Sequence, residues 1–70
     1  MTAADFHAWR QRMGLKKNEA ARALGIGVRT LDYYEAGQRS EGGAAPIPQT
    51  VALACAALAF GLPPYGAASA

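Results

Sequence analysis

The sequence predicts an all-α domain, a compact bundle of four to five helices, and three observations carry this prediction. The length of 70 residues limits the chain to one domain. Apolar residues make up 51% of the sequence, which argues against a disordered chain. Apolar side chains recur at helical spacings, and a glycine follows each of the first three such stretches. No part of the sequence reads as a β-strand.

The first three helices are predicted from their apolar faces and their final glycines. In the first, apolar side chains at i, i+3 and i+7 form one stripe of Phe6, Trp9 and Met13. The three segments cover about residues 3–13, 17–24 and 28–36.

A fourth helix is predicted at about residues 48–60, because Pro48 suits the first turn of a helix. Residues 38–46 before it are rich in glycine and polar side chains and read as a loop. The domain is therefore expected to cover residues 1–62, followed by a short flexible tail at residues 63–70.

Charge is distributed unevenly along the chain. The formal net charge is +2, but all seven Lys and Arg residues lie within the first 39 positions, together with four of the five acids. No charged side chain follows Glu41. A basic excess favours a polyanionic partner when it is focused on one face, whereas an uncharged apolar half favours burial against another chain.

Residues 15–37 have the spacing of a helix-turn-helix, two short helices joined by a three-residue turn that contains glycine. Ala21 is small enough for the crossing of the two helices, and Gly25 accepts the positive φ of a tight turn. Leu31 and Tyr34 are expected to anchor the second of these helices on the core. The residues left on its exposed face are Gly27, Arg29, Asp32, Tyr33 and Ala36.

This arrangement resembles the Cro/CI-type (XRE-like) helix-turn-helix regulators, over residues 6–62. The matching features are Arg10 in the first helix, the spacing of Ala21, Gly25 and Ile26, and the run Tyr34-Glu35-Ala36-Gly37-Gln38-Arg39, which is similar to the family's aromatic-Glu-x-Gly-x-Arg ending. The resemblance implies a lambda-repressor-like DNA-binding fold that places the helix at residues 28–36 in the major groove. It also implies a structural ion pair between Arg10 and Glu35.

One feature of the chain departs from the family's pattern, and another is similar to a narrower group of regulators. The family usually has Ser or Thr followed by Gln at the start of its second helix, where this chain has Lys16 and Lys17, so Lys17 can supply only a charge to phosphate. The alanine-rich fourth helix followed by Pro63-Pro64 is similar to small phage repressors that accompany anti-CRISPR genes.

Two groups of side chains are expected to contact DNA. Arg29 has the reach for a bidentate pair with guanine, whereas Asp32 could accept from cytosine N4 or orient Arg29. The base-contacting group is Arg29, Thr30, Asp32 and Tyr33. A helix N-terminus with two lysines suits phosphate, and the phosphate-contacting group is Lys16, Lys17, Asn18 and Arg39. The alternative is that these side chains are merely solvated.

The fourth helix has apolar residues around most of its circumference, so it has to be buried on more than one side. A monomer of this size cannot cover both sides, which predicts a homodimer with the two-fold symmetry of an inverted repeat. The expected interface residues are Val51, Leu53, Cys55, Leu58, Phe60 and Leu62. Cys55 is also interpreted as a small buried hydrophobe, and Phe60, like Trp9, as a core residue rather than a binding platform.

Several classes of protein are not supported by the sequence. There is no Ser/His/Asp set, acid–base pair or glycine-rich phosphate loop, so an enzyme is not expected. One cysteine and the isolated His7 predict no metal site, and no cofactor or small-molecule ligand is expected. The longest uninterrupted apolar stretch is shorter than the roughly 20 residues of a membrane span, and the N-terminus does not resemble a secretory signal, which predicts a cytoplasmic protein.

These observations together predict a homodimeric repressor that binds an inverted-repeat operator in a promoter, with half-sites about 34–36 Å apart. Control by its own concentration, through its own promoter, is the expected arrangement. Two alternatives remain open. One is an antitoxin whose apolar C-terminal half also binds a toxin, and the other is a protein-interaction module that has lost DNA binding.

Overall fold

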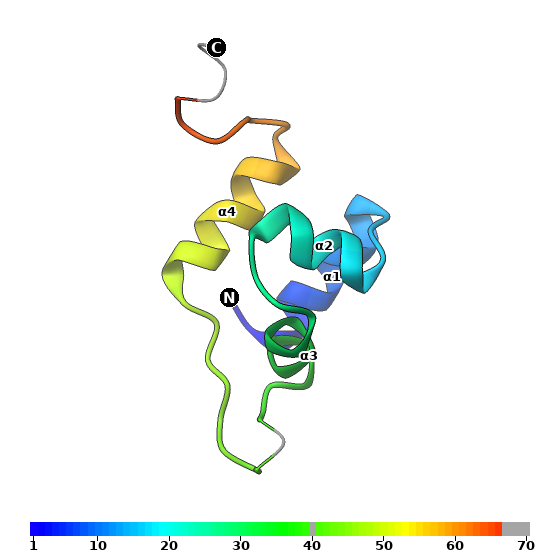
Figure 1. Ribbon diagram of the computed structural model, residues 1–70, viewed down its shortest axis with the longest axis vertical. Coiled ribbons are helices and arrows are strands. Elements are labelled where there is room, and N and C mark those ends of the chain that lie inside the picture. Colours follow the sequence, from blue (N-terminus) through cyan, green and yellow to red (C-terminus); the bar gives the residue numbers. More distant parts are fainter. Residues whose placement is uncertain (40, 67–70) are drawn as a thin grey trace.

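The computed structural model describes residues 1–39 and 41–66, and within these ranges the chain folds into four α-helices and no strand (Figure 1). The helices are α1 (Ala3–Met13), α2 (Lys17–Leu24), α3 (Val28–Ala36) and α4 (Gln49–Ala59). The all-α prediction is confirmed, and the first three helices have the predicted bounds. The fourth is one residue shorter at each end, because Pro48 is its N-cap and Phe60 its C-cap.

Local hydrogen bonds explain where α1 begins and where α2 ends. The Thr2 side chain accepts from the Asp5 N–H at 3.0 Å, and the Asp5 carboxylate accepts from the Thr2 N–H at 2.9 Å, which forms a capping box. Gly25 adopts a φ of 71°, a left-handed conformation that suits glycine. The chain then turns so that the Ile26 N–H donates to the Ala21 carbonyl at 2.9 Å, as in a Schellman ending.

The core lies where α1 and α2 each pack against α3 and α4, and its centre is aromatic. Phe6 is 0% exposed, and its ring lies 5.5 Å from that of Trp9 and 5.8 Å from that of Tyr34. The Trp9 indole N–H donates to the Cys55 carbonyl at 3.0 Å, a buried bond that ties α1 to α4. The fully buried Leu31 brings α3 onto the same core.

The fourth helix has two apolar faces with different environments. Its inner face carries Cys55, which is 2% exposed, with Val51 and Leu58 packed against the core on either side. Its outer face carries Leu53, which is 60% exposed, and leads to Phe60. Phe60 is 81% exposed, so the interpretation of this side chain as part of the core is wrong. The predicted interface set is thus divided between the core and the surface.

Cys55 requires a correction, because the core of its own chain covers it and leaves nothing to present to a partner. Burial raises the pKa of its thiol to about 11, so the side chain is uncharged at neutral pH and packs as a small apolar group.

The loop between α3 and α4 folds back on itself. Gln38 and Ala44 form an isolated antiparallel bridge, and the Arg39 N–H donates to the Gly43 carbonyl at 2.7 Å. Ala45 is buried and its N–H donates to the Gly37 carbonyl at 3.4 Å, which holds the returning segment of the loop against the end of α3. Ser40 in this loop and residues 67–70 of the predicted tail lie outside the described residues.

Candidate nucleic-acid interface

The helix-turn-helix consists of α2, the turn Gly25-Ile26-Gly27 and α3. Ala20 and Ala21 are both buried where α2 meets the core, and Ala21 is the small residue expected at the crossing of the two helices. Ile26 is half-buried and packs against the same core. The turn therefore holds α3 at a defined angle to α2, with one face of α3 exposed.

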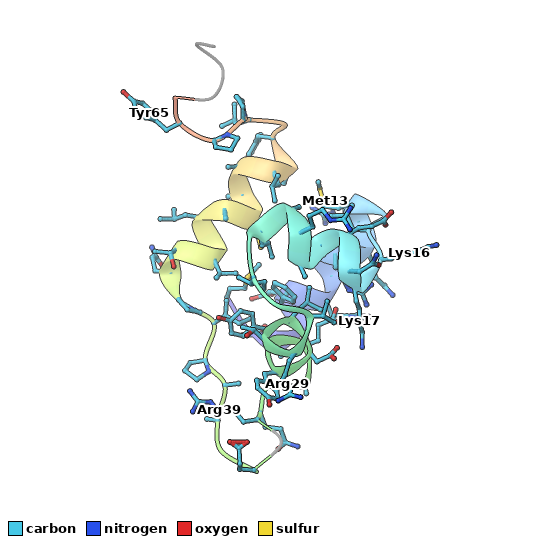
Figure 2. All side chains as sticks on the ribbon, in the orientation of Figure 1. Met13, Lys16, Lys17, Arg29, Arg39 and Tyr65 are labelled. Atoms are coloured by element: carbon cyan, nitrogen blue, oxygen red, sulfur yellow. The ribbon has the colours of Figure 1, made fainter. Side chains whose placement is uncertain are left out.

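The N-terminus of α2 presents cationic side chains and backbone N–H groups to solvent. Lys16 is the N-cap, and its own N–H donates to the Glu19 carboxylate at 2.8 Å. Figure 2 shows the Lys16 side chain extending away from the bundle. Lys16, Lys17 and Asn18 are all exposed, and the positive end of the α2 dipole adds to their charge. This end of the helix can therefore bind an anionic oxygen.

The exposed face of α3 carries fewer of the predicted base-contacting side chains than the helical spacing suggested. Arg29 and Asp32 are exposed, but Thr30 and Tyr33 are half-buried. Thr30, Tyr33 and Arg39 instead line one hollow of about 540 Å³ between α3 and the loop that follows it. The difference arises because the loop folds back along this side of α3, which helical periodicity cannot show.

An ion pair connects the two helices across the exposed surface. The Lys17 ammonium lies 2.9 Å from the Asp32 carboxylate, and both side chains are about half exposed. Figure 2 shows Lys17 beside α3, in contrast to Lys16. The sequence suggested Arg29 as the partner of Asp32, one turn away on the same helix. No local spacing could have indicated Lys17, because the two residues lie on different helices.

A second cluster anchors the C-terminal end of α3 on α1. Arg10 Nε donates to Glu35 Oε1 at 2.7 Å, so the structure brings together the pair that the family resemblance implies. Arg10 also donates to the Leu15 carbonyl at 3.0 Å. His7 Nδ1 lies 3.1 Å from the same Glu35 oxygen, a contact that sequence reasoning missed although His7 and Arg10 are one helical turn apart.

The cluster shifts the ionisation of Glu35. Burial by itself would raise the pKa of this carboxyl, but the hydrogen bonds and charges of Arg10 and His7 outweigh it, so the pKa lies below its ordinary value. The carboxylate is therefore charged at neutral pH and holds α3 through charge-assisted hydrogen bonds.

The depressed pKa of Glu35 predicts that acid reduces the free energy of unfolding. The stabilisation is fully present above about pH 4.3, the ordinary glutamate pKa, and is lost as pH falls through the lower folded-state value. Glu35→Gln should cost about 1–2 kcal/mol at neutral pH and should lose less stability on acidification. Urea unfolding followed by circular dichroism across this pH range measures both effects. An identical acid response in both proteins would show that Glu35 does not carry this dependence.

The described part of the chain contains neither a cluster of metal ligands nor a membrane-spanning helix. No group of three or more His, Cys, Asp or Glu side chains there could hold a metal ion. None of the described helices has the length and apolar character needed to cross a membrane.

The chain matches one known protein family. The comparisons with curated proteins and with solved structures gave no match. A helix-turn-helix family model matches residues 6–40, half of the chain, which cover most of α1 and all of α2 and α3. The match contains Arg10, the turn at Gly25 and the ending at Arg39. The chain therefore belongs to the Cro/CI-type (XRE-like) helix-turn-helix family of DNA-binding regulators.

Proposed function

We propose that this protein is a homodimeric repressor that reads an inverted-repeat operator by placing α3 in the major groove. The observation that carries the proposal is the exposed face of α3 with cationic groups on both sides. In the view of Figure 2, Arg29 on α3 falls between Lys17 from α2 and Arg39 from the following loop. A recognition helix flanked by phosphate-binding groups is the docking arrangement of a helix-turn-helix on DNA.

The roles of the side chains follow from their positions. Arg29 is exposed near the start of α3, and in this proposal it pairs with guanine O6 and N7. The side chains that contact phosphates in this proposal are Lys16, Lys17, Asn18 and Arg39. Tyr33 and Thr30 line the hollow next to Arg39. They contact DNA from the edge of α3, where a phosphate or a thymine methyl is within reach of a tyrosine.

The proposed dimer uses the outer face of α4. Leu53, Ala56 and Phe60 are exposed and share one stripe at i, i+3 and i+7. No charged side chain follows Glu41, so α4 itself contributes no charge to this face. A separate apolar hollow of about 170 Å³, between α2 and the C-terminal end of α4, can receive a partner side chain, and it is lined by Ala23, Ala54, Ala57, Leu58, Leu62, Pro63 and Pro64.

The proposal is tested by substituting Arg29, the arginine on the exposed face of α3. A duplex is first selected by the protein from a randomised library, and binding is then measured to variants with each base pair changed. Arg29→Ala should remove about 1–3 kcal/mol of preference at one G·C pair in each half-site and should lower affinity for unrelated DNA only modestly.

Two outcomes would count against this proposal. If Arg29→Ala keeps the full preference profile, another element reads the sequence. If the unmodified protein binds neither the library nor any duplex at low salt, the alternative of an interaction module without DNA binding is correct. Repression is tested separately by transcription from a promoter that carries the selected site, where the protein should lower the transcript level.

A further inference from the structure

The exposed face of α3 carries an acid, although this face is proposed to meet a polyanion. Three other acids of the helical region have structural partners: Asp5 caps α1, Glu19 accepts from the N–H of the residue that caps α2, and Glu35 anchors α3. Within the described residues, Asp32 takes no part in a helix cap or a buried contact. Its recorded ion pair is with Lys17, a side chain that the proposed function assigns to phosphate.

Lys17 therefore has two competing partners. Its ammonium is 2.9 Å from the Asp32 carboxylate, so it cannot bind a phosphate fully without weakening that contact. Both side chains are about half exposed, and an ion pair in this environment is weak enough to be exchanged. If Lys17 moves away from Asp32, the Asp32 carboxylate faces the DNA without a partner. This is unfavourable unless a hydrogen-bond donor replaces the Lys17 ammonium.

We propose that Asp32 determines specificity by acting through Lys17. On unrelated DNA, Asp32 keeps Lys17 and thereby withholds one phosphate contact. On the operator, the amino group of a cytosine, N4–H, donates to Asp32 in place of Lys17, which frees the ammonium for phosphate. This inference rests on the proposed DNA-binding function and adds to it a residue that penalises wrong sites rather than only rewarding the right one.

The exchange has a signature in the salt dependence of binding. Each phosphate that a lysine neutralises contributes about −0.9 to the slope of log affinity against log salt concentration. Lys17 should therefore contribute to the slope on the operator and not on unrelated DNA. Lys16, which has no acidic partner recorded in the described structure, should contribute equally on both.

The experiment compares Lys16→Gln, Lys17→Gln, Asp32→Asn and the double variant Lys17→Gln/Asp32→Asn. Each is titrated by fluorescence anisotropy over a salt series, with the selected duplex and with a scrambled duplex of equal composition. Lys16→Gln is the matched control, because it removes the same charge one residue away. Circular dichroism checks that each variant is folded, and all three positions are exposed.

The expected pattern differs between the two duplexes. Lys16→Gln reduces the slope by about 0.9 on both, whereas Lys17→Gln does so only on the selected duplex. Asp32→Asn raises affinity for the scrambled duplex severalfold and lowers the ratio of selected to scrambled affinity. In the Asp32→Asn background, Lys17→Gln reduces the slope on both duplexes.

The inference is overturned if Lys17→Gln reduces the slope equally on both duplexes while Asp32→Asn leaves the scrambled affinity unchanged. DNA binding would then stand, and Asp32 would be a solvated acid. A wild-type protein that binds neither duplex at low salt overturns the proposed function as well, so the two failures are distinguishable.

Discussion

Phe6→Ala is expected to leave most of the protein unfolded at room temperature. The side chain is 0% exposed and contacts both Trp9 and Tyr34, so its removal opens a cavity at the junction of α1 and α3. Truncating a buried phenylalanine costs about 3–5 kcal/mol. Small domains have a total stability of about 0.05–0.15 kcal/mol per residue, so this loss is comparable with the whole free energy of unfolding.

The matched control for this prediction is Phe60→Ala, the same substitution at a side chain that is 81% exposed. Thermal and urea unfolding followed by circular dichroism should show a large loss for Phe6→Ala. For Phe60→Ala, any loss should be confined to concentrations at which the protein is dimeric. Comparable losses for the two variants at high dilution would contradict the assignment of the core to Phe6.

Leu53→Glu is expected to convert the proposed dimer to a folded monomer and to reduce operator affinity by about 10²–10⁴-fold. This factor is the usual gain when two binding modules are linked, and it is lost when each half-site is bound separately. Leu53 is 60% exposed on the outer face of α4, so the charge is solvated in the monomer and buried only in the dimer. Leu58 is unsuitable for this test, because it packs against the core and a charge there would unfold the chain.

Light scattering at tens of micromolar protein measures the mass of the assembly directly, and titration with the selected duplex measures the affinity for DNA. Gln11→Glu provides the control, since it adds the same charge on an exposed part of α1. A monomeric wild-type protein under these conditions would refute the dimer. A second protein that co-purifies through the outer face of α4, and is released by Leu53→Glu, would favour the antitoxin alternative.

The sequence by itself determined the helices and the helix-turn-helix. Helix ends depend on local features, such as the glycine at position 25 and the Thr2–Asp5 capping box, and apolar periodicity reports which face of a helix is buried. The bounds of α1, α2 and α3 were therefore predictable. The contact between Arg10 and Glu35 was also available, although from the family resemblance rather than from spacing.

Only the tertiary structure decided which side chains meet across elements. The contact of Lys17 with Asp32 depends on the crossing of α2 and α3. The half-burial of Tyr33 depends on the returning loop, and the placement of Cys55 in the core depends on how α4 docks on α1. Periodicity identifies α4 as apolar on all sides but cannot say which side packs inward. That choice is made by the shape of the core and by the buried bond from Trp9 to the Cys55 carbonyl.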